Sequence, residues 1–364
     1  MPEAPAGAPV DFDLHGLASI RVLGGTPAEV RSVERVVGPL RGVLDRPADI
    51  TVRFVDELPL DGARLVGDDA AFDERAFYVL GGRRHARVVV RMPVERIGAG
   101  CEIVCRRGAP EVPYLREILN VSVLANGGLP VHAAAFAVGG VGTLVTGWSR
   151  GGKTEILLAA MAGGARYVGD EWVYVDADGR RLCGTLEPLT LWDWNVGDVA
   201  AASDVIPRRR RAAMRAVRTA VDGARRTDRG GARRLAALLE RRGSVRVAPD
   251  RLFGSGACAL EAGFDRLLLG VSHAGGGFGV TAGDAGDVAR RMAPCLAYEH
   301  RELLALRQKF RFAFPEAASP VLDDLERLLA ERLLHIFRGK ETHVLVHPYP
   351  SSLPALGESM RGLL

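Results

Sequence analysis

The clearest chemistry in this sequence comes from an octet with the spacing G-x-x-x-x-G-K-[ST], the pattern of a loop that binds phosphate groups. Glycines let several backbone N–H groups point at one phosphate without a side chain in the way. The lysine of such a loop reaches the β and γ phosphates of a nucleotide, and the last hydroxyl holds Mg²⁺. The octet therefore predicts that ATP and Mg²⁺ are bound by Gly147, Trp148, Ser149, Arg150, Gly151, Gly152, Lys153 and Thr154.

The sequence around the octet supplies the strand and the helix that such a loop needs. An apolar run, residues 141–146, precedes the octet, and a run with helical spacing follows it and stops at Gly163 and Gly164. The lysine also stands out, because the chain has three lysines against forty-five arginines. The alternative is a glycine-rich turn that matches the pattern by chance.

An acid pair and a histidine stand near the octet in the sequence. Asp170 and Glu171 follow a short predicted strand, residues 166–169, and His132 lies at the start of a predicted strand ahead of the octet. Phosphoryl transfer needs a carboxylate within hydrogen-bond reach of the attacking hydroxyl. Because successive strand residues point to opposite faces, we expect only one acid to be the base, and Asp170 is the predicted one. The alternatives are a core histidine and acids that only form a turn.

Two segments carry a resemblance to a known family. LPVHAAAFAVGGVGTLVTGWSRGGKTE, residues 129–155, and RYVGDEWVYV, residues 166–175, resemble the histidine, hairpin, glycine loop and acidic strand end of the bacterial HPr kinase/phosphorylase family. The core of that family in turn resembles the phosphoenolpyruvate carboxykinases. The resemblance implies an α/β fold with a P-loop kinase core.

The resemblance also implies a role for each matching residue. Lys153 and the loop amides hold the phosphates, and Thr154, Glu155 and Glu171 hold or flank Mg²⁺. Asp170 corresponds to the carboxylate that takes the proton from the acceptor hydroxyl, with Glu171 and His132 beside it as further catalytic residues.

Three departures from the family bear on the substrate. The chain has Arg150 where the family usually has glycine and Glu171 where it has aspartate, and it lacks the family's second signature downstream. The resemblance therefore favours relatives that phosphorylate a serine of a peptide precursor, or a small hydroxyl compound, over a kinase of HPr itself.

Composition limits the class of protein. With 364 residues, 48% hydrophobic and 25% charged, the chain is typical of a globular protein long enough for two domains. We expect a cytoplasmic protein with reduced thiols, because there is no secretory signal, no long uncharged apolar run and an odd number of cysteines. A net charge of +4 does not by itself imply a nucleic-acid partner.

The remaining segments predict the domain organisation. Residues 1–111 predict a smaller N-terminal α/β domain whose first ten or so residues are disordered, with a helix over 27–44. Its role is open between dimerisation, substrate holding and support. Residues 112–364 predict the kinase domain, with a helix over 112–126, a strand over 131–138 that forms a hairpin with 141–146, and a glycine-rich hairpin turn over 273–279.

An arginine-rich insertion interrupts the predicted kinase domain at about residues 200–250. Residues 207–251 hold fifteen arginines and four acids around two predicted helices, 208–220 and 232–239. The arginines either offer guanidinium groups to phosphate or an acidic peptide, or form a solvated basic face. Base-stacking aromatics do not interleave with them, so nucleic-acid binding is a weaker interpretation.

The four tryptophans, residues 148–194, either pack in the core or line the predicted pocket.

Together these features predict an ATP-dependent, Mg²⁺-requiring kinase that phosphorylates a hydroxyl, and the favoured acceptor is a serine of a peptide or protein. The alternatives are a kinase of a small hydroxyl metabolite and a catalytically silent ATP-binding regulator that uses the arginine-rich insertion for a partner.

Overall fold

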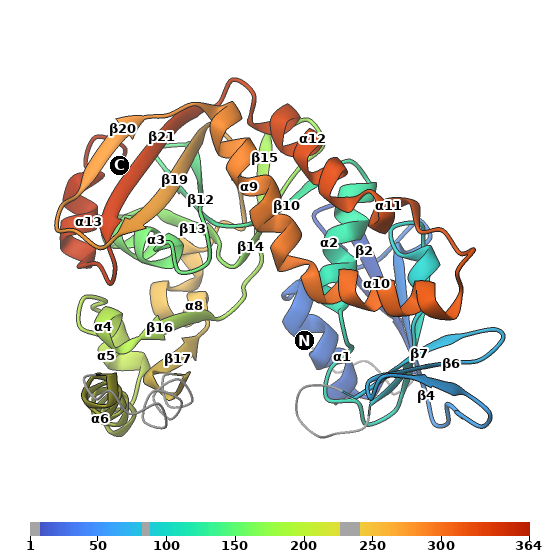
Figure 1. Ribbon diagram of the computed structural model, residues 1–364. Coiled ribbons are helices and arrows are strands. Elements are labelled where there is room, and N and C mark those ends of the chain that lie inside the picture. Colours follow the sequence, from blue (N-terminus) through green and yellow to red (C-terminus); the bar gives the residue numbers. More distant parts are fainter. Residues whose placement is uncertain (1–7, 82–87, 226–240) are drawn as a thin grey trace. The chain divides into compact units, whose positions relative to one another are not determined.

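The computed structural model describes residues 8–81, 88–225 and 241–364. Over these residues the chain is a mixed α/β protein that divides into two compact units (Figure 1). Unit 1 holds Met1–Val131, Tyr174–Arg180 and Ala289–Arg338, and unit 2 holds His132–Val173, Arg181–Val288 and Gly339–Leu364. Among the described helices, none is both long and apolar enough to cross a membrane.

These units differ in layout from the two continuous domains that the sequence predicts. Helix α2 (Leu115–Ala125) lies beyond the predicted boundary at residue 111 but belongs to unit 1, where it packs against α1 (Pro27–Val37). The apolar face of a helix decides which sheet it joins, and the order along the chain does not. The prediction of a disordered start falls mostly on residues 1–7, outside the described residues, and strand β1 begins at Val10.

Unit 1 is built on a nine-stranded sheet. Its central strands β2, β4 and β9 run parallel, and Ile20, Ile50 and Ile103 from these strands are fully buried. The strands in spatial order are β3 (Arg41–Gly42), β1 (Val10–Leu14), β2 (Ala18–Leu23), β4 (Ile50–Val55), β9 (Cys101–Arg106), β8 (Val89–Arg91), β7 (Phe77–Leu80), β6 (Ala70–Phe72) and β5 (Arg64–Val66).

Helix α1 joins β2 to β4 and has defined ends. The Thr26 hydroxyl accepts from the Glu29 N–H, while the Glu29 carboxylate accepts from the Thr26 N–H at 2.7 Å, so both donors are satisfied. The helix ends at Val37, because Gly38 after it has a positive φ of 84° and a ψ of −177°, which only glycine adopts readily. The prediction of a helix as far as residue 44 is therefore wrong at its C-terminal end.

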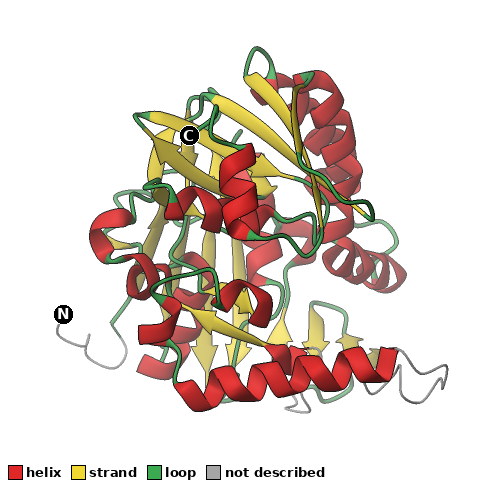
Figure 2. Cartoon of the chain, turned by 90° about the vertical axis from the view of Figure 1, so that its left-hand side faces the viewer, coloured by secondary structure: helices red, strands yellow, loops and turns green. Residues whose placement is uncertain are grey.

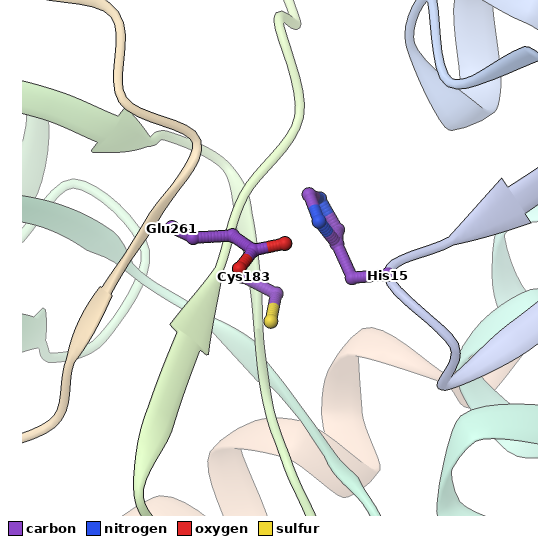
Figure 3. Close-up of side chains that lie close together, drawn as sticks. All are labelled: His15, Cys183 and Glu261. Atoms are coloured by element: carbon purple, nitrogen blue, oxygen red, sulfur yellow. The ribbon is translucent and has the colours of Figure 1, made fainter.

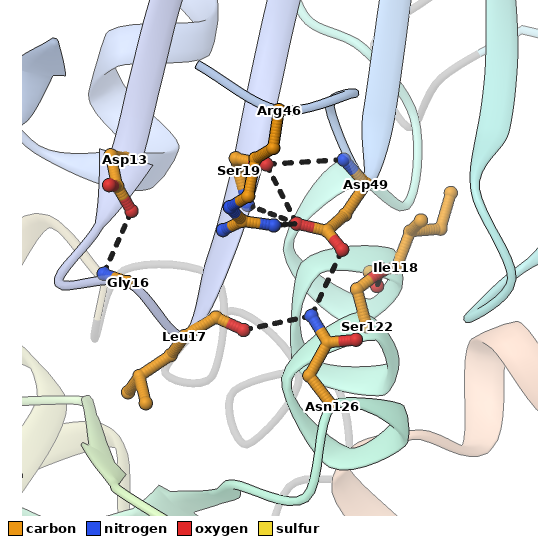
Figure 4. Close-up of polar contacts among 9 residues, drawn as sticks. All are labelled: Asp13, Gly16, Leu17, Ser19, Arg46, Asp49, Ile118, Ser122 and Asn126. Carbon is orange, nitrogen blue, oxygen red and sulfur yellow. Dashed lines mark hydrogen bonds and ion pairs between the residues drawn. The ribbon is translucent and has the colours of Figure 1, made fainter. Parts of the chain in front are cut away.

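A polar cluster ties the end of α2 to the sheet of unit 1 (Figure 4). Asn126 Nδ2 donates to the Leu17 carbonyl at 2.9 Å and to Asp49 at 3.0 Å. The second carboxylate oxygen of Asp49 accepts from the hydroxyl of Ser19 at 2.7 Å and from Arg46 at 3.1 Å. Burial raises the pKa of Asp49, but the hydrogen bonds from Asn126 and Ser19 outweigh it and leave the pKa below its usual value. Unit 1 also holds α10 (Arg301–Ala313), α11 (Pro320–Asp323), α12 (Leu325–Phe337) and most of α9 (Ala285–Glu299), whose first four residues belong to unit 2.

Unit 2 is built on a six-stranded sheet that carries the glycine loop, residues 147–152. Strands β11 and β12 form the predicted antiparallel hairpin, and β12, β19 and β21 run parallel. Helices α3 (Lys153–Ala162) and α13 (Leu353–Ser359) pack against each other, and α3 packs on β11 and β12. The strands in spatial order are β13 (Arg166–Gly169), β11 (Ala134–Val138), β12 (Val141–Thr146), β19 (Arg266–His273), β21 (Glu341–Pro348) and β20 (Gly279–Ala282).

Two predicted details of this sheet are wrong. The expected strand over 131–138 is two strands, β10 (Leu129–His132) and β11. Two of the five junctions between the units fall within β10 and β14 (Trp172–Val175). The glycine-rich turn does not make a hairpin, because β21 lies between β19 and β20 in the sheet and β20 pairs with β21. The sequence near the glycine-rich turn does not indicate that β21, from the C-terminal part of the chain, pairs between β19 and β20.

The rest of unit 2 consists of paired short strands and helices. In β15 (Arg181–Cys183) and β18 (Glu261–Gly263), Cys183 is the cross-strand partner of Glu261, and both are labelled in Figure 3. Strand β16 (Leu189–Trp192) pairs with β17 (Ser244–Val247). Helix α6 (Arg208–Arg225), the long helix along the lower edge of Figure 2, matches the first predicted helix of the insertion. The second, over 232–239, lies outside the described residues. The remaining helices are α4 (Asp193–Val196), α5 (Ala202–Val205) and α8 (Pro249–Phe253).

Candidate functional site

The glycine loop joins the C-terminal end of β12 to the N-terminal end of α3, so the first-turn N–H groups of α3 face the loop. Gly152 precedes α3 in the left-handed conformation, with φ of 81°, and Arg150 also has a positive φ of 64°. Gly147 lies against β19, where an added Cβ would stand 2.6 Å from the Gly270 carbonyl oxygen. The loop can thus take its close path only with glycine at positions 147 and 152, whereas Arg150 has a side chain in a backbone conformation that favours glycine.

His347 in β21 holds the loop from the sheet side. Its Nε2 donates to the Gly151 carbonyl oxygen at 3.0 Å, its Nδ1 lies 2.8 Å from the Ser351 hydroxyl, and the ring is fully buried. His347 was not among the predicted site residues, because it lies almost two hundred positions beyond the octet. The only sequence signal for it is a histidine in an apolar strand.

Lys153 lies inside the loop and does not extend into solvent. Its side chain is 7% exposed, and Nζ donates to the carbonyl oxygens of Gly147 at 3.1 Å and Trp148 at 3.2 Å. Carbonyl oxygens of the loop therefore hold the ammonium group at the first residue of α3, and a cation in this position suits a bound anion.

Thr154 and Asp170 are in direct contact. The Thr154 hydroxyl lies 3.1 Å and 3.3 Å from the two carboxylate oxygens of Asp170, and Asp170 is 2% exposed. Burial raises the pKa of Asp170 to about 7, the negative charge of Glu171 adds to the rise, and the hydrogen bond from Thr154 opposes it. A carboxylate with a pKa near neutral pH is suited to take and release a proton.

Glu171 lies beside Asp170 but in a different environment. Its carboxylate lies 3.3 Å from His132 Nε2, and its side chain is 43% exposed. The hydrogen bond from His132 holds the pKa of Glu171 below its usual value, against the effect of burial. The His132 ring is stacked on Trp172, with centroids 5.6 Å apart.

The expectation that the two acids point to opposite faces is wrong. Strand β13 ends at Gly169, and Glu171 takes a left-handed conformation, with φ of 66°, before β14 begins. The alternation of a strand therefore stops before Asp170, and both acids line the same cleft. Each acid changes the electrostatic environment of the other.

A cleft of about 300 Å³ in unit 2 brings the predicted residues together. Of the predicted site residues, only Gly147 and Trp148 do not line it, and the Trp148 side chain is 53% exposed. Glu155 is buried, with its carboxylate 3.5 Å from Trp194 Nε1. The lining residues are His132, Ser149, Arg150, Gly151, Gly152, Lys153, Thr154, Glu155, Asp170, Glu171, Thr190, Trp192 and Tyr349. Of these, Thr190 and Tyr349 were not predicted, and Trp192 was left open between packing and lining.

The oxygen atoms of this cleft fit Mg²⁺. The Thr154 hydroxyl and the carboxylates of Glu155, Asp170 and Glu171 are hard ligands of the kind that Mg²⁺ prefers, and Mg²⁺ keeps several waters or phosphate oxygens in its shell. Within either unit, the described residues contain no group of three His, Cys, Asp or Glu side chains close enough to form a complete cage. A cation here would therefore take part of its coordination from a phosphate ligand.

Comparison of the chain with protein-family models and with curated proteins finds no match to either. The geometry of the cleft therefore carries the functional argument.

Proposed function

We propose that this chain is a cytoplasmic, ATP- and Mg²⁺-dependent kinase with a P-loop core of the HPr-kinase type, which transfers the γ-phosphate to a hydroxyl group. The observation that carries the proposal is the contact between Thr154 and the buried Asp170 beside Lys153, at the mouth of the glycine loop. A cation ligand, a charge for the phosphates and a carboxylate with a raised pKa lie together in one cleft, as phosphoryl transfer requires.

Each residue has a part in the proposed reaction. The loop N–H groups and Lys153 bind the phosphates, and Thr154 would hold Mg²⁺ together with oxygens of the acid pair. The cation supplies charge neutralisation at the phosphates. Asp170 accepts the proton of the attacking hydroxyl at a carboxylate oxygen. Burial, together with the negative charge of Glu171, keeps the pKa of Asp170 near neutral pH, and His132 is hydrogen-bonded to Glu171.

The acceptor in this proposal is a serine of a peptide or protein. Helix α6 supports a peptide acceptor with acidic residues, since Arg208, Arg209, Arg215 and Arg218 are exposed on it. A small hydroxyl compound is the second candidate, because a cleft of about 300 Å³ also suits a small ligand. A silent regulator would have no use for a buried carboxylate with a pKa near 7 next to the phosphate loop.

The test is phosphate transfer from labelled ATP under single-turnover conditions, with Mg²⁺ and a panel of serine peptides and small hydroxyl compounds. We expect ADP and a phosphorylated acceptor in equal amounts. Binding of ATP without transfer to any acceptor, and without hydrolysis, would instead identify a regulator.

A further inference from the structure

Three aromatic rings form a cluster beside the cleft. The indole rings of Trp192 and Trp194 are stacked, with centroids 5.1 Å apart and planes 3° from parallel, and Tyr349 meets Trp194 edge to face at 6.2 Å. Trp192 and Tyr349 line the cleft, whereas Trp194 does not. Trp194 therefore covers one face of the Trp192 indole ring. Trp192 is half-buried and contributes its remaining surface to the cleft.

The cluster contacts the first turn of α3. The Trp194 indole reaches Glu155, with Nε1 3.5 Å from the carboxylate, and Glu155 follows Thr154 in the first turn of the helix. Asp170 contacts Thr154 through the hydroxyl. The aromatic cluster and Asp170 thus contact neighbouring residues in the first turn of α3, Glu155 and Thr154.

Strand β16 contributes two residues to the lining of the cleft. Thr190 and Trp192 both line the cleft and are two residues apart, which is about 7 Å along a strand. Trp192 is the one of the two that stacks on Trp194, whose indole contacts Glu155. The aromatic surface of the cleft therefore lies at the Trp192 end of this strand segment.

This arrangement matches the polarity of a nucleoside triphosphate. With the transferred phosphate at Lys153 and Asp170, the base lies at the far end of the phosphate chain. Building on the proposed function, we infer that Trp192 binds the base of a purine nucleoside triphosphate by stacking, so that the two indoles and the base form a stack of three rings. An aromatic side chain of the acceptor is the competing occupant, but the acceptor hydroxyl must approach the acid end.

Stacking predicts a particular selectivity. It depends on the overlap of ring faces and tolerates every base, because each base has a π-face. ATP and GTP should therefore bind with similar affinity, and both should bind more tightly than CTP or UTP, whose rings are smaller. Mg²⁺-tripolyphosphate, which has the charges but no base, should bind most weakly.

The experiment compares the binding of Mg²⁺-ATP and Mg²⁺-tripolyphosphate by calorimetry. Trp192→Ala should weaken ATP binding roughly tenfold or more, the usual effect of removing a base-stacking ring, and should leave tripolyphosphate binding within about twofold. Trp192→Phe should restore most of the ATP affinity. Phe278→Ala, which removes an exposed aromatic ring of unit 2 that does not line the cleft, should change neither affinity. Thermal unfolding of each variant checks that it is folded.

The outcomes separate this inference from the proposed function. Equal losses for both ligands in Trp192→Ala, or wild-type affinities that are the same for both ligands, overturn the stacking role and leave the kinase proposal standing. A higher KM for the acceptor with unchanged nucleotide affinity assigns the ring to the acceptor and also overturns it. A wild-type protein that binds neither ligand overturns both proposals.

Discussion

Gly152 lies so close to His347 that a Cβ atom added to the glycine would stand 2.3 Å from the ring carbon Cε1. The same ring donates to the carbonyl oxygen of Gly151. Strand β21 therefore shapes the glycine loop in two ways, by a hydrogen bond and by filling the space beside it. The two residues are therefore in direct contact, even though almost two hundred positions separate them in the sequence.

Because of this contact, substitutions of Gly152 and His347 should not be additive. Gly152→Ala forces the ring away and strains a left-handed residue, and His347→Ala leaves a buried carbonyl oxygen without its donor, which costs about 1–3 kcal/mol. In the double variant the clash is absent, so the combined loss of stability should be smaller than the sum by about 1–3 kcal/mol. Urea unfolding of the wild type and the three variants measures this coupling.

His343 provides the matched control for this cycle. It lies near the start of the same strand, where its Nε2 is 2.8 Å from the Glu341 carboxylate. Gly152→Ala combined with His343→Ala should be additive within about 0.5 kcal/mol. Equal coupling at both histidines would show that the effect belongs to the strand as a whole.

Lys153→Ala should abolish most ATP turnover and leave the fold intact. The ammonium group is a single charge aimed at the phosphates, and removing one preorganised donor of this kind lowers rates by about 10²–10³. Lys340→Ala is the control, because Lys340 bonds to the Phe264 carbonyl in unit 2 and does not line the cleft. Single-turnover transfer and thermal unfolding are measured for both. Near-wild-type turnover in Lys153→Ala would contradict the assignment of the loop.

The sequence identifies the local parts of this site and misses the parts supplied by distant strands. The octet, its strand and its helix can be predicted because spacing and periodicity are local properties, and the structure brings Lys153, Thr154 and Asp170 together. His347 and Tyr349 come from β21 and the turn after it, and nothing near the octet specifies which strand will pass beside it. The prediction for Glu171 failed for a local reason. It assumed that side chains alternate between two faces as in a strand, but β13 ends at Gly169, before the acid pair.

The pH dependence of stability should report the buried Asp170. Its pKa is about 7 in the folded chain and near 3.8 when exposed, so the protonated form favours the folded state. This stabilisation is complete below about pH 4 and is lost as pH rises through 7, by up to about 4 kcal/mol. Asp170→Asn cannot ionise, so the stability of the wild type relative to this variant should fall over that range. Asp250→Asn, at an exposed acid of unit 2, should follow the wild type in metal-free urea unfolding from pH 4.5 to 8.

The rate of transfer should show which acid is the base. If Asp170 must be ionised to accept the proton, the single-turnover rate rises with pH and then levels off. The midpoint lies below the pKa of about 7 that the metal-free carboxyl has, because Mg²⁺ beside Asp170 favours the ionised form. Asp170→Asn lowers the plateau by roughly 10²–10⁴. Glu171→Gln removes the neighbouring negative charge, so the pKa of Asp170 falls and the midpoint of the profile moves to lower pH with a smaller loss of plateau rate. Equilibrium ATP binding, measured in parallel, should change little in either variant, because the loop and Lys153 hold the phosphates. A larger loss of rate in Glu171→Gln than in Asp170→Asn would reverse the roles, with Glu171 as the base and Asp170 as the group that positions Thr154 and its cation.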